Sequence, residues 1–255
     1  MEKLKDIETK HDVKIPLAIE SGSRGWGFAA VNADYDCRFL YVHKPERYLS
    51  ISEPKEFIDY ELDETYDVKG YDIKRALKYI KKSNATIYEW ISSNVVYIRD
   101  ENIVQKLRLL TEEFFNPIPI SYHYLSLAKK MLHEITESNE AKIKKYFYIL
   151  RPIANINYII QHGKMPFMEY DKTLDASAPP LKILQAIKEL KEKKAILQEH
   201  DKIPTHELLV SYFISEIDRF EDFLKTMKHK KNTDDTYLDE SFREILKDVW
   251  KNATP

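Results

Sequence analysis

The sequence is poor in several residue types, and each shortage excludes a class of protein. Its 255 residues include a single cysteine, Cys37, which cannot form a disulfide within one chain. Free thiols of this kind are typical of reducing compartments. No apolar run approaches the roughly 18 residues of a membrane-spanning helix, and the opening MEKLKDIETKHDVKIP lacks the apolar core of a signal peptide. We therefore predict a cytoplasmic protein with no membrane partner.

An excess of charge of one sign is also missing. The chain has 40 basic and 42 acidic residues and a net charge of −2, so its overall field neither attracts nor repels nucleic acid strongly. The eight histidines show no compact pair with a nearby glutamate, and the sequence does not predict a zinc site. A hydrophobic content of 43% predicts a globular chain with one large or two modest domains.

Glycine is scarce, but three of the five glycines stand close together: Gly22, Gly25 and Gly27. Apolar residues alternate over Ile15–Ile19 and lead into Ser21-Gly22-Ser23, a pattern that predicts a short strand followed by a tight turn. We expect the glycines to adopt positive φ and to let a ligand approach the backbone. The amides of such a turn converge on an anion, and the Ser23 hydroxyl adds a donor. The predicted ligand is a triphosphate.

The next segment, Asp34–Val42, alternates like a strand. Asp34, Asp36 and Arg38 should share one face, and their neighbours, among them Cys37, should take the other as core residues. Along a strand the two aspartates lie about 6.5–7 Å apart, which allows them to hold paired metal ions roughly 3.5–4 Å apart. An isolated Asp-x-Asp is also typical of a polar strand edge. The Gly-Ser turn eleven residues earlier favours the metal site.

A third carboxylate would complete such a site from a neighbouring strand. Residues Glu64–Gly70 have the pattern of that strand, with Asp67 on the face opposite Tyr66 and Val68. Asp72 is the competing candidate. It directly precedes an amphipathic helix that starts at Ile73, so we predict that it is the N-cap of that helix.

Four segments carry a resemblance to a known family: GSRGWGF, DYDCRFLYV, YDVKGYDIKRALKYIKKSNATIYEWISS and KKYFYILRPIANINYIIQHGKMPFMEY. They resemble the YcgL-type predicted nucleotidyltransferases of the DNA polymerase beta superfamily, and the likeness runs over nearly the whole chain. Three positions depart from the usual family pattern. Ala33 stands where a small hydroxyl residue often precedes the first aspartate, Ala85 where proline is usual, and Ser93 where a Ser-Pro step is common. None of the three removes a proposed ligand.

The resemblance implies roles for individual residues. It implies that Gly22 and Ser23 bind phosphate, that Asp34 and Asp36 bind metal, and that Asp67 is the third carboxylate. The residues to which we assign further nucleotide contacts are Arg24 and Arg38, at positions that match the family, and Arg151 in the helical part. The implied cofactors are two Mg²⁺ ions, with Mn²⁺ as a substitute, and a nucleoside triphosphate such as ATP.

The predicted fold is α+β, with a change of character near Asn116-Pro117-Ile118-Pro119, where two prolines interrupt a helical pattern and indicate a hinge. We expect a nucleotidyltransferase-type catalytic domain at residues 1–115, a mixed β-sheet with flanking helices. An α-helical domain should follow at residues 116–255, with a cleft between the two. Its predicted helices are Tyr122–Glu137, Glu140–Gln161, Pro180–Glu199, Thr205–Lys228 and Leu238–Trp250.

The predicted function is metal-dependent transfer of a nucleoside monophosphate from a triphosphate to an acceptor hydroxyl, with release of pyrophosphate. An RNA end, a protein and a small molecule all stay open as acceptors. The alternative is a catalytically retired nucleotide sensor or interaction module that works with a toxin–antitoxin or RNA-repair partner. Retention of all three aspartates favours catalysis. A third possibility, a helical scaffold whose acidic strand binds Ca²⁺, leaves the Gly-Ser turn unexplained.

Overall fold

The protein is described here by a computed structural model, which covers residues 1–29, 33–60, 65–197, 201–228 and 234–251. Its fold is α+β, with a mixed sheet and many helices, as the sequence predicts. The chain divides into two compact units that alternate along the sequence. The sheet unit comprises Met1–Gly25, Asp34–Phe115 and Lys231–Pro255, and the helical unit comprises Trp26–Ala33 and Asn116–Lys230.

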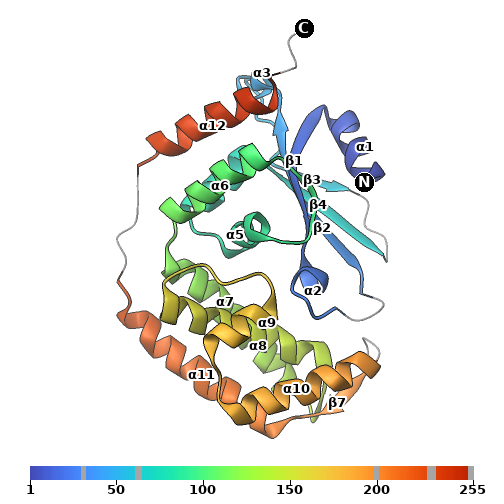
Figure 1. Ribbon diagram of the computed structural model, residues 1–255, viewed down its shortest axis with the longest axis vertical. Coiled ribbons are helices and arrows are strands. Elements are labelled where there is room, and N and C mark those ends of the chain that lie inside the picture. Colours follow the sequence, from blue (N-terminus) through green and yellow to red (C-terminus); the bar gives the residue numbers. More distant parts are fainter. Residues whose placement is uncertain (30–32, 61–64, 198–200, 229–233, 252–255) are drawn as a thin grey trace. The chain divides into compact units, whose positions relative to one another are not determined.

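The sheet unit is built on five strands in the order β3-β4-β2-β1-β5 (Figure 1). Their bounds are Val13–Glu20 for β1, Tyr35–His43 for β2, Phe57–Tyr60 for β3, Tyr66–Asp72 for β4 and Val96–Arg99 for β5. β1 is antiparallel to β2 and to β5, and β3 is antiparallel to β4. β2 and β4 are parallel. This one parallel pair in the described sheet brings the starts of two strands to the same edge.

Burial of both faces explains the composition of the central strands. Every residue of β1 except Lys14 is buried, which is typical of a strand covered on both sides. Helix α1 (Glu2–His11) contributes Leu4 and Ile7 to a core cluster that includes Cys37 and Phe39 of β2. The prediction that Cys37 is a core residue is therefore confirmed.

Glycine is required at one position inside the sheet. Gly70 of β4 pairs with Phe39 of β2, and a Cβ atom on Gly70 would lie 2.2 Å from the Phe39 ring. The aromatic ring thus occupies the space of the missing side chain. Any larger residue at position 70 would force the two strands apart.

Three helices of the sheet unit begin at side-chain caps. They are α4 (Ile73–Lys81), α5 (Ala85–Ser92) and α6 (Glu101–Glu113). Asp72 accepts a hydrogen bond from the Lys74 amide at 2.8 Å, which confirms it as the N-cap of α4. Asn84 and Asp100 cap α5 and α6 in the same way. Such caps satisfy amides that have no partner within the helix.

A helix from the far end of the chain completes the sheet unit. α12 (Thr236–Val249) packs against α6 and α4, and Asn102 donates to Asp248 at 2.7 Å. Trp250 then donates its indole N–H to the His43 carbonyl at 2.9 Å. One change between the compact units falls at Phe115/Asn116, the predicted domain boundary. The units differ from a division into 1–115 and 116–255 in two places: α12 belongs to the sheet unit, and Trp26–Ala33 belongs to the helical unit. That functional division stays a prediction.

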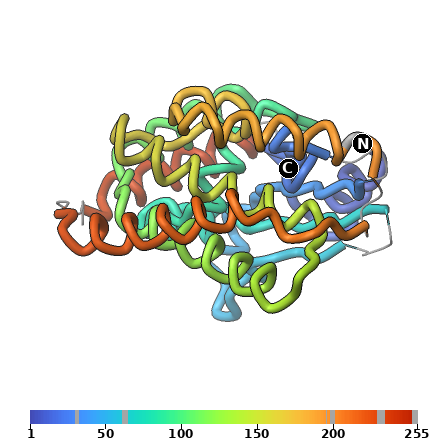
Figure 2. The backbone as a smooth tube through the Cα atoms, turned by 90° about the horizontal axis from the view of Figure 1, so that it is seen from below, coloured from blue at the N-terminus to red at the C-terminus, as the bar shows by residue number. Residues whose placement is uncertain are grey.

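The helical unit contains long helices and one short two-stranded sheet. The helices are α7 (Pro117–Thr136), α8 (Ile143–His162), α9 (Tyr170–Ser177), α10 (Leu181–Ile196) and α11 (Glu207–Thr226), and the strands are β6 (Glu140–Lys142) and β7 (Lys202–Pro204). α7 packs against α8 and α11, and α8 also packs against α9 and α10 (Figures 1 and 2). Glu199, the predicted end of one helix, lies outside the described residues.

Two helix predictions in this unit are wrong at their starts. The prolines at 117 and 119 do not interrupt a helix but stand in the first turn of α7, with Asn116 as the cap. Proline is tolerated there because the first amides of a helix have no partner within it. The predicted helix at Glu140–Gln161 begins only at Ile143, because Glu140–Lys142 pairs with Lys202–Pro204 as a strand.

Trp26 and Phe28 contact other residues of the helical unit. The Trp26 carbonyl accepts the Tyr170 amide at 2.9 Å. The Phe28 ring stacks on Phe147 at 5.3 Å between centroids, and Lys194 donates to the Phe28 carbonyl. The chain therefore enters the helical unit directly after the glycine-rich turn.

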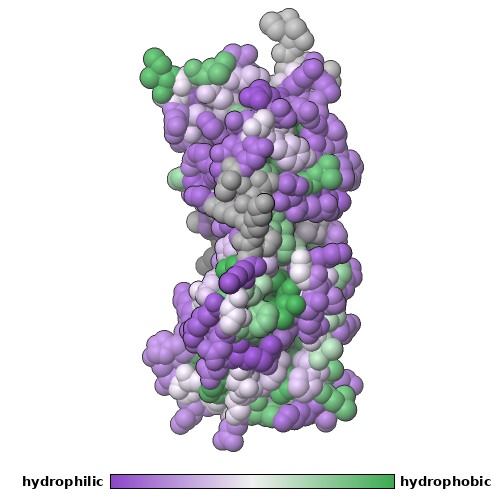
Figure 3. All heavy atoms as spheres, turned by 90° about the vertical axis from the view of Figure 1, so that its left-hand side faces the viewer, coloured by the Kyte–Doolittle hydropathy of each residue, from purple (hydrophilic) through white to green (hydrophobic). Residues whose placement is uncertain are grey.

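No helix in the described ranges is long and apolar enough to cross a membrane. The face drawn in Figure 3 is mostly hydrophilic, with hydrophobic side chains in small groups. Leu49 and Ile51 are among the most exposed apolar residues in the described part of the chain, at 86% and 107%. Both follow the short helix α3 (Pro45–Tyr48).

Candidate functional site

The predicted aspartates lie at the edge where β2 and β4 begin. The parallel register pairs Asp36 with Asp67, so the two side chains leave the same face of neighbouring strands, which lie about 4.8 Å apart. Asp34 is exposed and stands just before β2. We call these three residues, Asp34, Asp36 and Asp67, the acidic end of the β2–β4 pair.

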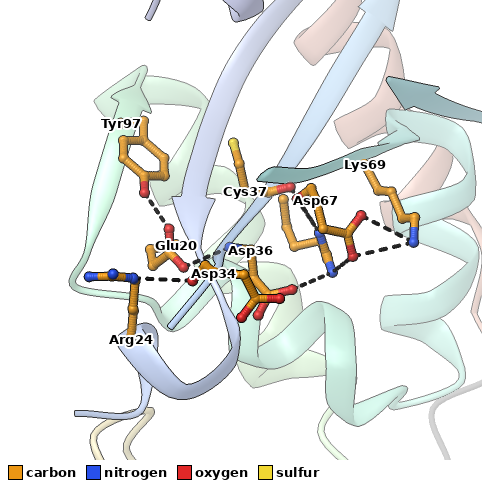
Figure 4. A network of polar contacts seen from close by, with 9 residues as sticks. Glu20, Arg24, Asp34, Asp36, Cys37, Asp67, Lys69 and Tyr97 are labelled. Carbon is orange, nitrogen blue, oxygen red and sulfur yellow. Dashed lines mark hydrogen bonds and ion pairs between the residues drawn. The ribbon is translucent and has the colours of Figure 1, made fainter. Parts of the chain in front are cut away.

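Asp34 and Asp36 carry neighbouring charges at this edge. The two side chains overlap in the view of Figure 4, and Asp34 acts electrostatically on Asp36. The pKa of Asp36 is raised, chiefly because burial disfavours its charged form and also because Asp34 and Asp67 repel it. The Arg38 cation opposes this rise. Additional positive charge beside Asp36 would therefore stabilise its ionised form.

Arg38 joins Asp36 to Asp67. One guanidinium nitrogen, Nη2, donates to Asp36 Oδ1 at 2.9 Å and to Asp67 Oδ2 at 2.7 Å, and Nη1 donates to the Asp67 carbonyl at 2.7 Å. Lys69 Nζ lies 3.1 Å from Asp67 Oδ1. Burial alone would raise the pKa of Asp67, but the two cations hold it below its usual range. The predicted common face of Asp36 and Arg38 is confirmed, and the arginine lies between the carboxylates.

Within the described ranges, no group of three or more acidic, histidine or cysteine side chains is arranged closely enough to hold a metal ion. The aspartates nevertheless offer carboxylate oxygens, which hard divalent cations prefer. Asp36 and Asp67 already bind one cation between them, the Arg38 guanidinium. The donor chemistry of the acidic end therefore fits a divalent cation, on condition that Arg38 releases at least one carboxylate.

The glycine-rich turn packs directly on Asp36. Gly22–Gly25 forms a one-turn helix, α2, where the sequence predicts a tight turn. Gly22 has a φ of +58°, and a Cβ atom there would lie 1.9 Å from Asp36 Oδ2. The Ser21 amide donates to the Asp36 carbonyl at 2.8 Å. The predicted positive φ is confirmed at Gly22 and Gly27 and is wrong at Gly25, which is helical.

The two other arginines lie in different units. Arg24 donates from Nε to the Asp34 carbonyl at 3.1 Å, and its guanidinium stacks over Tyr35 at 4.1 Å. It is thus held at the acidic end. Arg151 is buried in the helical unit, where its guanidinium lies 4.1 Å from the centroid of the Trp26 ring. Its contact with a nucleotide stays a prediction.

The sequence analysis missed Glu20, the last residue of β1. Its side chain is buried at 2% exposure, accepts the Asp36 amide at 2.9 Å and accepts the Tyr97 hydroxyl of β5 (Figure 4). Burial raises the pKa of Glu20, against the effect of these two hydrogen bonds. An acid at the end of an otherwise apolar buried strand was the available signal. Glu20 fixes the backbone that carries Asp36.

Known proteins are similar to this chain over most of its length. The model of a family described as RlaP, RNA repair pathway DNA polymerase beta family, matches residues 1–244. The chain is 33% identical over 253 residues to the uncharacterised protein YcgL of Bacillus subtilis (strain 168), covering 99% of this chain and 97% of that protein. A crystal structure of a nucleotidyltransferase-like protein from Exiguobacterium sibiricum 255-15 aligns over 95% of this chain and 79% of that one, with 12% identity and a TM-score of 0.35. A TM-score of this size supports no statement about fold or function.

Proposed function

The chain belongs to the RNA repair pathway DNA polymerase beta family, and from that membership we propose that it is a metal-dependent nucleotidyltransferase. The resemblance to YcgL-type proteins is confirmed by the identity of 33%. The proposed reaction moves a nucleoside monophosphate from a triphosphate, such as ATP, to an acceptor hydroxyl and releases pyrophosphate. The observation that carries the proposal is the register of Asp36 with Asp67 beside the Gly22 turn.

We assign Asp34, Asp36 and Asp67 as the residues that would hold two Mg²⁺ ions, with Mn²⁺ as a substitute. When bound, such ions neutralise phosphate charge and help to orient the triphosphate. The chain's own contribution is to keep two of these carboxylates in register on adjacent strands. Arg38 forms ion pairs with both Asp36 and Asp67 in the structure described here. Once released from them, its guanidinium would bind a phosphate oxygen.

The other residues bind and orient the substrates. Gly22 leaves room at Asp36, and the Ser23 hydroxyl with the amides of the turn would donate to the phosphates. Arg24 supplies positive charge beside Asp34. Arg38 and Lys69 keep Asp67 ionised by lowering its pKa, the state in which it can accept a proton from the attacking hydroxyl.

The family description favours an RNA end as the acceptor, and a protein or small-molecule hydroxyl is the alternative. We place the reaction in the cytoplasm. Purified protein with Mg²⁺ or Mn²⁺ would be incubated with each α-labelled nucleoside triphosphate, together with RNA of defined ends or with cell extract. The class of molecule that becomes labelled identifies the acceptor.

The double substitution Asp34→Asn/Asp36→Asn tests the proposal. We expect transfer to fall by at least about 10³-fold, because charge stabilisation at the phosphates is usually the largest catalytic contribution. Asp59→Asn is the control, since Asp59 is an exposed aspartate of β3 in the same sheet. Circular dichroism would confirm that both variants fold. Retained transfer in the double variant would contradict the proposal.

The second candidate is a nucleotide sensor or interaction module for a toxin–antitoxin or RNA-repair partner. The Arg38 bridge favours it, because Asp36 and Asp67 are neutralised by the protein itself. A sensor would bind a nucleoside triphosphate at the acidic end without labelling any acceptor. Binding lost in the double variant, with no transfer by the unaltered protein, would support the sensor over the enzyme.

A further inference from the structure

A basic pocket lies at the other end of β2 from the aspartates. Its volume is about 550 Å³, within the 300–1,000 Å³ typical of ligand sites. The residues that line it are Lys10, His11, Asp12, His43, Lys44, Glu46, Arg47, Ser50, Lys55 and Ile58. Four of these are cationic and two are acidic, in a chain whose net charge is −2. All ten belong to the sheet unit.

The backbone of this pocket is fixed from several sides. His43 ends β2, where its amide donates to the Tyr48 hydroxyl at 3.1 Å and its carbonyl accepts Trp250 at 2.9 Å. The Lys55 carbonyl accepts the Tyr41 hydroxyl at 2.7 Å. The wall is therefore rigid at His43 and Lys55, while the Arg47 and Lys55 side chains extend into solvent.

The charges of the pocket suit an anion. One pair is internal, with Lys44 Nζ 2.8 Å from Asp12 Oδ2, and the remaining cations exceed the one remaining carboxylate, Glu46. The pKa of His11 is lowered, first by burial and then by Lys10, Lys55 and His43. The pKa of His43 is also lowered, again first by burial and in part by Arg47. Nearby cations therefore add to the effect of burial at both imidazoles, and at His43 the Lys55 carbonyl and Asp12 oppose it.

The lining also indicates which part of a ligand would bind. Among the described residues of the lining, Ile58 is the one aliphatic residue, and none is a Phe, Tyr or Trp that could stack on a base. Bases are usually held by aromatic stacking, whereas phosphates are held by Lys and Arg. The chemistry of the pocket therefore matches phosphate groups more than bases.

We propose that this basic pocket is a second phosphate-binding site, which takes the phosphates of a free nucleotide or of an RNA strand. Asp36 and His43 are separated along β2 by about 23 Å at 3.3 Å per residue, so a mononucleotide cannot reach both ends. An RNA strand of several nucleotides can. The site does not depend on the transfer reaction and would exist in an enzyme or in a sensor.

The test is a double charge reversal, Arg47→Glu/Lys55→Glu, in the full chain. Lys5→Glu/Lys82→Glu is the matched control, because both lysines are exposed, lie in the sheet unit and are absent from the pocket. Binding of fluorescein-labelled decauridylate and of labelled ADP would be followed by anisotropy in EDTA, where no transfer occurs. Arg47→Gln/Lys55→Gln provides a milder variant in case the reversal disturbs folding.

We expect the reversal to weaken binding of at least one probe about tenfold and the control to leave it unchanged. For decauridylate, the magnitude of the slope of log K against log salt should fall by about 1.4, since two phosphate contacts are lost at about 0.7 each on a single strand. Loss with decauridylate alone identifies RNA as the source of the phosphate, and loss with ADP alone identifies a free nucleotide. Unchanged binding of both probes in the reversal and glutamine variants would overturn the proposal. Transfer measured separately on the same proteins keeps this result distinct from failure of the proposed reaction.

Discussion

The two ends of β2 differ in how their charges are balanced. At the acidic end, Arg38 contacts Asp36 and Asp67 directly with partly buried side chains. At the basic pocket, the ion pair between Lys44 and Asp12 joins two exposed side chains, and exposed pairs contribute little to stability. The acidic end is therefore organised by the protein itself. In the basic pocket, Lys10, Arg47 and Lys55 outnumber Glu46, and this excess of cations favours an anionic ligand from solution.

Two aspartates on β4 differ in the direction in which their surroundings shift the pKa. Asp67 is held ionised by Arg38 and Lys69, which keep its pKa low. Asp72 is buried at 1% exposure, accepts the Tyr48 hydroxyl at 2.6 Å and caps α4. Burial raises the pKa of Asp72 to about 6. Both residues are aspartates, so their neighbours decide that Asp67 pairs with cations and that Asp72 caps a helix.

Among single substitutions, the largest expected effect comes from filling the space beside Asp36. Gly22→Ala should reduce transfer by at least about 100-fold, because displacement of a catalytic group by 1 Å can cost this much. Its Cβ atom would lie 1.9 Å from Asp36 Oδ2. Initial rates of label transfer would measure the loss.

Gly27→Ala is the control for the Gly22 variant. Gly27 also has a positive φ, of +85°, but a Cβ atom there meets nothing within 4 Å. Both variants should lose about 1 kcal/mol of stability from backbone strain, and only Gly22→Ala should lose activity. Equal loss of transfer in both would mean that strain, and not the contact with Asp36, matters.

A smaller effect is expected at the buried aspartate. Because folding raises the pKa of Asp72 to about 6, the stability that this residue contributes is present below its unfolded pKa of about 4 and is lost as pH rises through about 6. The side-chain amide that Asp72→Asn introduces does not titrate in this pH range. The free energy of unfolding of the variant relative to the unaltered protein should therefore rise by on the order of 2 kcal/mol between pH 4 and pH 7.

Urea unfolding at the two pH values measures this difference. Asp100→Asn, at the exposed cap of α6, is the matched variant and should change its relative stability less. A pH-independent difference for Asp72→Asn would show that Asp72 does not titrate differently in the folded and unfolded states.

The smallest expected effect concerns the cation between the acids. Arg38→Gln should lower the free energy of unfolding in EDTA by about 1–2 kcal/mol, because hydrogen bonds to Asp36 and Asp67 are lost. Mn²⁺ should then stabilise this variant more than the unaltered protein, since a ligand that binds the folded state raises its stability. Thermal unfolding with and without Mn²⁺ is the measurement.

Lys69→Gln serves as the comparison for Arg38. Lys69 forms an ion pair with Asp67 alone of these two described aspartates, Asp36 and Asp67, and its side chain is 37% exposed against 16% for Arg38. We expect a smaller loss of stability and a smaller response to Mn²⁺. If the two variants respond equally, Arg38 has no special place between the carboxylates.

Local patterns were sufficient for much of the acidic end. Alternation in the sequence placed Asp36 and Arg38 on one face and Cys37 in the core, and the helix pattern after Asp72 identified a cap. These features depend on neighbours within a few residues. They could therefore be predicted without a fold.

The remaining features depend on residues that are distant in the sequence. The bridge from Arg38 to Asp67 requires the register of β2 with β4, and the contact of Glu20 with Asp36 requires the pairing of β1 with β2. The strand at Glu140–Lys142 exists because Lys202–Pro204 lies beside it. None of these pairings has a signal in a local window of the sequence.

The alternating composition of the two units limits how the protein can be dissected. The chain changes unit at Gly25/Trp26, Ala33/Asp34, Phe115/Asn116 and Lys230/Lys231. A fragment that stops at residue 115 would lose α12 and would release the Phe28 ring from its stack on Phe147. Single-cut truncation therefore yields neither half intact, and experiments that ask what the helical part contributes must rely on point substitutions in the full-length chain.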